Sequence, residues 1–214
     1  MLKIAHRGYS DKYKDNTLEA FEHAVRNHFD MIELDIQLCK SGEIIIYHDT
    51  VINSRMIIDC TLDELKKMDS DIITLGVFFK KINSFNIKIF LDVKGFDEII
   101  NPLVNFIKKN LFHIYIPNLY ISSFNLITIE ALKKINIPFK LGITTSNYYS
   151  KNQINNMLDN IDFVCIDWTV LDKNIVDYLK GKNKMVFSCS CENYNNYCYM
   201  KQYNLDGIVS NILI

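Results

Sequence analysis

Short apolar runs alternate with amphipathic stretches along the whole chain. Most neighbouring runs are separated by segments with helical spacing, for example residues 16–27, 97–110 and 125–135. Strands that alternate with helices predict parallel βαβ units. The runs with the length and composition of β-strands are residues 2–5, 31–36, 44–49, 88–93, 119–124, 139–143, 163–167, 185–189 and 207–210.

One junction between these strands lacks a helix. The segment MIELDIQLCKSGEIIIYHD, residues 31–49, passes from one strand to the next through KSGE alone. So short a turn joins antiparallel neighbours, because a parallel crossover needs a dozen or more residues. We therefore predict that residues 44–49 form a return strand on the second strand. The other eight strands then close into a (β/α)₈ barrel of the TIM type, and we expect residues 1–214 to form a single barrel domain.

Composition narrows the class of protein. Of 214 residues, 49% are hydrophobic and 23% charged, and the net charge is −1. These values suit a sizeable core and give no sign of nucleic-acid binding or a polybasic anchor. The start of the chain lacks the apolar region of a signal peptide, and no apolar run approaches the roughly 18 residues of a membrane span. We expect a soluble, cytoplasmic protein without stable membrane insertion.

Its six cysteines, including CSC at 189–191, fit no disulfide framework or zinc spacing.

Polar residues gather at the carboxyl ends of the predicted strands, where barrels of this kind carry their chemistry. Glu33 and Asp35 lie two residues apart and therefore point to the same face of their strand. Two carboxylates on one inward face repel each other unless something positive binds them, and a divalent cation with oxygen ligands is the natural partner. Asp92 is a candidate third ligand. The strand-end residues are His6, Arg7, Glu33, Asp35, Asp92, Lys94, Ser122, Ser123, Asp167 and Trp168.

The hairpin adds a second histidine. If Ser41 and Gly42 form a two-residue turn, counting outward places Asp35 opposite His48. Directly opposed residues lie roughly 5 Å apart, so His48 is expected beside the metal site. Taken singly, each residue has a structural alternative, such as a hydrogen-bonded histidine or a salt bridge. Together, two histidines, three acids, an arginine and a lysine suit phosphoryl chemistry.

The start of the first strand and helix has its own signals. Gly8 follows His6 and Arg7 and allows the backbone to turn sharply after the strand. Asn16 and Glu19 have the spacing of a capping box, which predicts that the first helix begins at Asn16.

Several of these motifs resemble the glycerophosphodiester phosphodiesterases. AHRG, DNTLEAF and MIELDIQLCKSGEIIIYHD carry the resemblance, and CTLDELKKMD, IFLDVKG, YISSF and YNLDGIVSN follow in the same order, over essentially the whole chain. The segment between His48 and Asp92 is too short for the insertion domain of longer members. The resemblance therefore implies the small, single-domain type.

The resemblance also implies an activity and a role for each matching residue. The expected reaction is metal-dependent hydrolysis of a glycerophosphodiester, a small-molecule substrate, to sn-glycerol 3-phosphate and an alcohol. One divalent ion, Mg²⁺ or Ca²⁺, is the implied cofactor. The implied roles are acid–base catalysis by His6 and His48, phosphate binding by Arg7 and Lys94, and metal binding by Glu33, Asp35 and Asp92, with Ser123, Phe124 and Trp168 as candidate substrate-pocket residues.

The chain departs from the family pattern at three positions. Asp92 stands where a glutamate is usual, Ser188 where a tryptophan is usual, and Asn211 at the aspartate of a Thr-Asp ending. Trp168, at the preceding strand end, is a candidate replacement for the missing aromatic wall.

Two alternatives to the glycerophosphodiester phosphodiesterase function remain open. One is a phospholipase D-like enzyme acting on lysophospholipid or sphingomyelin, with SNYYS (146–150) near an apolar cleft. The other is a non-catalytic phosphate-binding barrel.

Overall fold

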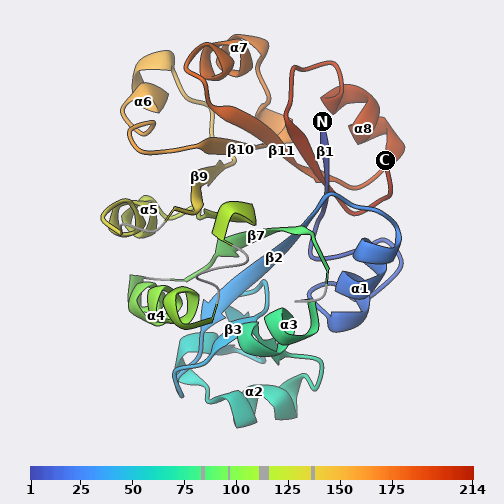
Figure 1. Cartoon of the computed structure of the whole chain (residues 1–214), viewed down its shortest axis with the longest axis vertical. Coiled ribbons are helices and arrows are strands. Elements are labelled where there is room, and N and C mark those ends of the chain that lie inside the picture. The colour runs from blue at the N-terminus through green and yellow to red at the C-terminus, as the bar shows by residue number, and fades with distance from the viewer. Residues whose placement is uncertain (83–84, 96, 111–115, 136–137) are drawn as a thin grey trace.

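Eight parallel strands form a closed barrel (Figure 1). The computed structural model describes residues 1–82, 85–95, 97–110, 116–135 and 138–214. The first barrel strand pairs with both the last and the second, which closes the barrel as the sequence predicts. In spatial order the strands are β1 (Leu2–Ala5), β12 (Gly207–Ser210), β11 (Met185–Cys191), β10 (Phe163–Asp167), β9 (Lys140–Thr145), β8 (Leu119–Ser122), β7 (Lys88–Val93) and β2 (Met31–Leu38).

Helices surround the barrel in Figure 1 and cover the outer faces of its strands. Within the described ranges, no helix is long and apolar enough to cross a membrane. Short 3₁₀ turns span Ile57–Asp59, Asp97–Ile99, Ile116–Asn118 and Trp168–Val170. The α-helices are α1 (Leu18–Arg26), α2 (Leu62–Met68), α3 (Leu75–Ile82), α4 (Ile100–Asn110), α5 (Leu126–Lys133), α6 (Lys151–Asn155), α7 (Lys173–Gly181) and α8 (Tyr194–Met200).

The return strand is present, but its register differs from the prediction. β3 (Ile44–Ile46) runs antiparallel to β2, and β6 (Ile73–Thr74) pairs with its other edge. The loop between β2 and β3 has three residues, 40–42, because Cys39 N–H donates to Glu43 O at 3.0 Å and Gly42 adopts φ +93°. The extra loop residue shifts every pair by one. Tyr47 therefore lies opposite Asp35, to which its N–H donates at 3.2 Å, so the predicted Asp35–His48 pairing is wrong.

The segment after β3 holds two further short strands that the sequence pattern did not predict. β4 (Val51–Ile52) and β5 (Arg55–Met56) form a small separate hairpin. β3 itself ends at Ile46, whereas the prediction extended it to Asp49. Residues 47–49 therefore follow the strand as a loop.

The barrel interior is filled by a layer of aromatic rings. Phe163 packs edge-on against Phe90, with ring centroids 5.3 Å apart, and lies 5.2 Å from Phe187. Gly142 on the neighbouring strand makes room for Phe163, since a Cβ there would lie 2.3 Å from the ring. Phe90 precedes Asp92 by two residues on β7, so the polar end of the barrel stands directly on this apolar layer.

Candidate active site

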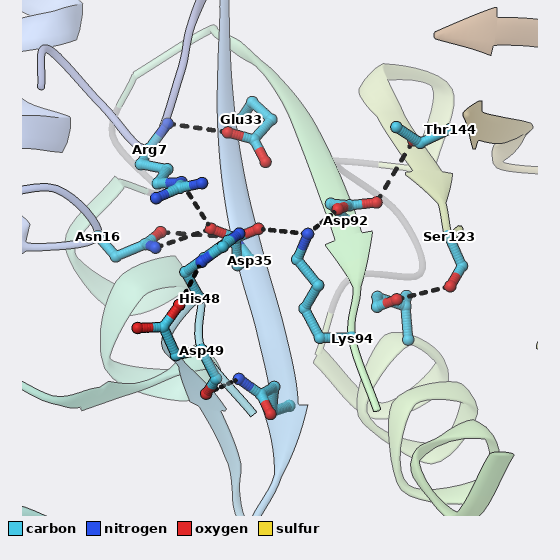
Figure 2. Close-up of polar contacts among 12 residues, drawn as sticks. Arg7, Asn16, Glu33, Asp35, His48, Asp49, Asp92, Lys94, Ser123 and Thr144 are labelled. Atoms are coloured by element: carbon cyan, nitrogen blue, oxygen red, sulfur yellow. Dashed lines mark hydrogen bonds and ion pairs between the residues drawn. The ribbon is translucent and has the colours of Figure 1, made fainter. Parts of the chain in front are cut away.

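The predicted polar residues meet in one cavity of about 180 Å³ at the carboxyl ends of the strands. Side chains from β2, β7 and the segments after β1 and β3 converge there (Figure 2). The residues of the sequence-based catalytic, phosphate and metal groups that line the cavity are His6, Arg7, Glu33, Asp35, His48, Asp92 and Lys94. Seven residues separated by up to 88 positions in the sequence therefore share one site.

Three buried carboxylates form the centre of this site. Glu33 and Asp35 point inward from β2, and the parallel register places Asp92 of β7 beside Asp35. All three residues are buried, with at most 5% of their surface exposed, and each offers an oxygen within 4.8 Å of the others. Burial and the neighbouring carboxylates raise the pKa of Glu33 well above its usual range, and burial also raises the pKa of Asp92. The site therefore holds more negative charge than its surroundings stabilise.

Two cationic side chains offset part of this charge. Lys94 Nζ lies 3.1 Å from Asp35 Oδ1 and 2.5 Å from Asp92 Oδ2. Arg7 Nε lies 3.1 Å from Asp35 Oδ2. Burial alone would raise the pKa of Asp35, but Lys94 and Arg7 outweigh it and lower that pKa. Glu33 forms no ion pair with Lys94 or with the Arg7 guanidinium, and it accepts a hydrogen bond from the Arg7 backbone N–H at 2.8 Å.

The donor set fits a hard divalent cation. Two cations face three carboxylates, and the strongly raised pKa of Glu33 marks its ionised form as poorly stabilised without a further cation. Every candidate ligand atom is a carboxylate oxygen, the type that Mg²⁺ and Ca²⁺ prefer. In the described part of the chain, this triad is the one group of three or more such side chains close enough to hold a metal ion.

His6 lies at the end of β1 and is held by the last strand's loop. Its Nδ1 lies 2.5 Å from Asn211 Oδ1, which accepts the Nδ1 proton. This tautomer leaves Nε2 without a proton and free to accept one. Burial and the nearby Arg7 lower the pKa of His6 to about 4, so its imidazole is neutral near pH 7.

His48 reaches the same cavity by a different route from the one predicted. It lies in the loop that follows β3 rather than in a strand opposite Asp35. Its Nδ1 lies 2.7 Å from Asp49 Oδ1, and its side chain is 40% exposed. Both histidines are thus partly exposed at the barrel mouth, His6 tied to Asn211 and His48 beside Asp49.

Comparison with known proteins now identifies the family. A model of the glycerophosphoryl diester phosphodiesterase family matches residues 6–211, which is nearly the whole chain. This chain belongs to that family. Its members are phosphoric diester hydrolases, and the chain is assigned to that enzyme class.

Individual relatives agree with the family assignment. YhdW of Bacillus subtilis, provisionally named a glycerophosphodiester phosphodiesterase, is 28% identical over 98% of this chain and 94% of its own length. A glycerophosphodiester phosphodiesterase of Caldanaerobacter subterraneus is 31% identical over 66% of this chain and 65% of its own.

Solved structures share the barrel. A glycerophosphodiester phosphodiesterase from Thermotoga maritima superposes with a TM-score of 0.82 at 25% identity, covering 99% of this chain and 94% of the other. A phosphodiesterase from Oleispira antarctica, solved with its product sn-glycerol 3-phosphate, has a TM-score of 0.88 at 22% identity, covering 99% and 93%. The similarity to the Oleispira antarctica structure shows a shared fold.

The family motif DNTLEAF contains a site residue that the sequence-based interpretation assigned to helix capping. The N-cap of α1 is Thr17, whose hydroxyl accepts from Ala20 N–H at 3.3 Å, so the predicted capping box at Asn16 is wrong. Asn16 instead adopts φ +57° and turns its side chain inward, where Nδ2 donates to Asp35 Oδ2 at 2.9 Å. A cap and an inward-facing amide use the same residue type, so local sequence does not distinguish them.

Asp92 is also held by two hydroxyl groups, one from Ser122, which the strand-end pattern selected, and one from Thr144, which it did not. The Ser122 hydroxyl donates to Asp92 Oδ1 at 3.1 Å, and the Thr144 hydroxyl lies 3.4 Å from the same oxygen. Figure 2 shows Thr144 and Lys94 on opposite sides of the Asp92 carboxylate. The shorter carboxylate of Asp92, where the family usually has glutamate, is therefore fixed from both sides.

The three candidate substrate-pocket residues have different positions. Phe124 lines the cavity, and its ring lies 5.1 Å from Lys94 Nζ. Ser123 is 1% exposed and donates to Val93 O at 2.6 Å, so it supports the strand end from behind.

Trp168 does not form the expected aromatic wall. The chain turns into a 3₁₀ helix at Asp167, which accepts the Thr169 N–H at 2.9 Å. Trp168 therefore packs edge-on against Tyr199, 5.9 Å between ring centroids, and is not among the residues lining the cavity. Ser188 is buried and donates to Ile166 O at 2.8 Å, so no aromatic side chain replaces the family tryptophan at either position.

Proposed function

We propose that this protein hydrolyses glycerophosphodiesters to sn-glycerol 3-phosphate and an alcohol in a divalent-metal-dependent reaction. The observation that carries the proposal is the meeting, in one cavity, of two histidines, three buried carboxylates and two cations. Family membership supports the same reaction class. A binding module would have little use for two histidines beside a metal site.

Arg7 and Lys94 are proposed to hold the phosphate. Both cations already lie within 3.1 Å of Asp35, so a phosphate entering the cavity meets positive charge that is fixed in place. Glu33, Asp35 and Asp92 would hold the metal, with Mg²⁺ or Ca²⁺ favoured by the all-carboxylate set. Once bound, the ion would screen the phosphate charge and increase the acidity of a nearby hydroxyl.

His6 and His48 are proposed to carry out the proton transfers. The glycerol hydroxyl next to the phosphate attacks phosphorus, one histidine removes its proton, and the other protonates the leaving alkoxide. Water then opens the cyclic phosphate with the two roles reversed. His6 is suited to accept a proton because its pKa of about 4 keeps the ring neutral, with Nδ1 occupied by Asn211.

A substrate panel tests this function. Metal-free protein is mixed with glycerophosphocholine, glycerophosphoethanolamine or lysophosphatidylcholine, each with Mg²⁺, Ca²⁺ or Mn²⁺, and the released alcohol is measured. We expect glycerol 3-phosphate and alcohol from the short diesters only when metal is present. Absence of turnover with every metal and substrate would instead support a non-catalytic phosphate-binding barrel.

The panel also separates a phospholipase D-like function. Phe124 at the cavity and Tyr148 in the loop after β9 are 50% and 74% exposed, which gives the barrel mouth some apolar surface. The Tyr148 hydroxyl donates to Thr169 O at 3.1 Å, so this loop is tied to the next one. Activity restricted to the long-chain substrate would favour the lipid-cleaving function over the proposed one.

A further inference from the structure

Gln37 continues the polar series of β2 beyond the two metal-site carboxylates. Glu33, Asp35 and Gln37 alternate along the strand and share one face, whereas Ile36 points into the core outside the barrel. Gln37 is 3% exposed. A buried primary amide requires partners for its two N–H hydrogens, so the position of those partners shows what the side chain does.

Both hydrogens of Gln37 are donated to the loop that carries His48. Nε2 donates to Tyr47 O and to Asp49 O, each at 2.8 Å. These are the carbonyl groups of the residues immediately before and after His48. The amide therefore holds the loop at two points, with the histidine between them.

The loop has little regular structure of its own. β3 ends at Ile46 and β4 begins at Val51, so residues 47–50 have no strand ladder. Tyr47 N–H donates to Asp35 O at 3.2 Å, which fixes the beginning of the loop. Beyond that point, the two bonds from Gln37 attach the backbone of the loop to β2. In Figure 2, His48 and Asp49 lie beside Asp35, at the end of the site opposite Ser123 and Thr144.

We propose that Gln37 is a positioning residue that places His48 for proton transfer by holding the two flanking carbonyl groups. The inference rests on the proposed function, in which His48 exchanges a proton with substrate. Misplacing a catalytic group by about 1 Å can cost about 10²-fold in rate. A primary amide is required, because a carboxylate offers no donor to two carbonyl oxygens and an apolar side chain offers none at all.

Gln37→Met tests the inference, since methionine keeps the length and burial of the side chain and removes both donors. We expect kcat to fall roughly 10- to 100-fold, the usual scale for losing a supporting partner, with KM and the half-saturating Mg²⁺ concentration changed less than about threefold. Gln202→Met is the matched control, because Gln202 donates one exposed bond, to Cys198 O at 3.2 Å. Unchanged kcat in Gln37→Met would overturn the inference.

A double-mutant cycle shows whether Gln37 acts through His48. In a His48→Ala background, Gln37→Met should lower kcat by less than about threefold, because the group it positions is gone. Losses that multiply in the double variant would show that Gln37 acts elsewhere. If Gln37→Met does not fold, as judged by circular dichroism, Gln37→Asn takes its place, with an amide one methylene short and a smaller loss of kcat expected.

Hydrogen–deuterium exchange separates this inference from the proposed function. Peptides covering residues 47–52 should exchange faster in Gln37→Met than in wild type, while peptides from α7 do not change. The exchange measurement tests the attachment of the loop even if the wild type hydrolyses none of the diesters. Such a lack of hydrolysis would contradict the proposed function but not the role of Gln37 in holding the loop. Equal exchange of residues 47–52 in both proteins would overturn the two-point attachment of the loop.

Discussion

Asn211→Asp should raise the pKa of His6, because it replaces a neutral hydrogen-bond acceptor on the ring with a charged one. In the wild type, the neutral Asn211 amide accepts from His6 Nδ1, and burial lowers the pKa of His6 to about 4. An aspartate at 211 would place a full negative charge about 4 Å from the imidazolium charge. At an effective dielectric constant of about 20, that attraction amounts to about 4 kcal/mol, or about 3 pKa units. Allowing for burial of the new charge, we expect His6 to titrate roughly 2 to 3 units higher.

The assay is a ¹H NMR titration of the histidine Cε1 protons in metal-free protein, with His6 assigned by its loss in His6→Asn. The same shift should appear as a higher acidic limb in the pH dependence of kcat/KM for the metal-loaded enzyme. Asn195→Asp is a matched control, since Asn195 lies on α8 and is exposed. If His6 titrates within about half a unit of its wild-type value in Asn211→Asp, the account of the His6–Asn211 contact is wrong.

The same pKa has a consequence for stability. Because the folded-state pKa of about 4 lies below the ordinary 6.5, the folded protein favours neutral His6. That stability is fully present above about pH 6.5 and is lost as the pH falls toward 4. The loss amounts to at most about 3 kcal/mol over this window. Chemical denaturation from pH 7 to pH 4 should show a smaller loss in Asn211→Asp than in wild type. Equal pH dependence in the two proteins would contradict the depressed pKa.

Three further substitutions test other parts of the site and barrel. Glu33→Gln should raise the melting temperature of metal-free protein by roughly 2–4 °C at pH 7–8, because it removes a carboxyl group whose ionised form is penalised by burial and by Asp35 and Asp92. The same substitution should abolish stabilisation by Mg²⁺, and a lower melting temperature without metal would contradict the prediction. Asp92→Ala should raise the half-saturating metal concentration at least roughly tenfold, and an unchanged value would remove Asp92 from the metal site. Gly142→Ala should destabilise the barrel by roughly 1–3 kcal/mol in denaturant unfolding, since the new Cβ would lie 2.3 Å from the Phe163 ring. Adding Phe163→Leu should relieve part of that loss. Additive effects of the two substitutions on the free energy of unfolding would show that the Cβ and the ring do not clash.

The strand pattern predicted the barrel because its information is local and periodic. Alternation along β2 places Glu33 and Asp35 on the inward face, and the missing helix after β2 predicts the antiparallel return strand. The register of that strand was mispredicted because it depends on one turn. Gly42 at φ +93° allows a three-residue loop where the sequence equally suits two residues.

Local sequence patterns do not reveal the side-chain amides that hold the site residues in place. Asn16, Gln37 and Asn211 lie in three separate segments, and each is identified by the group that accepts or donates to it across the barrel mouth. Asn16 followed by Glu19 matches a capping signal that Thr17 in fact supplies. Trp168 was placed in the pocket because it follows a strand end, but a 3₁₀ turn directs it toward Tyr199.

The most direct test of the central claim compares three histidine variants under one condition. Glycerophosphocholine hydrolysis is followed by ³¹P NMR in metal-loaded wild type, His6→Asn, His48→Asn and His28→Asn, the last being an exposed histidine of positive φ that asparagine tolerates. The two-histidine mechanism predicts glycerol 3-phosphate at the wild-type rate from His28→Asn, and rates roughly 10²- to 10⁴-fold lower from the other two. Near-wild-type turnover by either His6→Asn or His48→Asn would contradict the two-histidine mechanism.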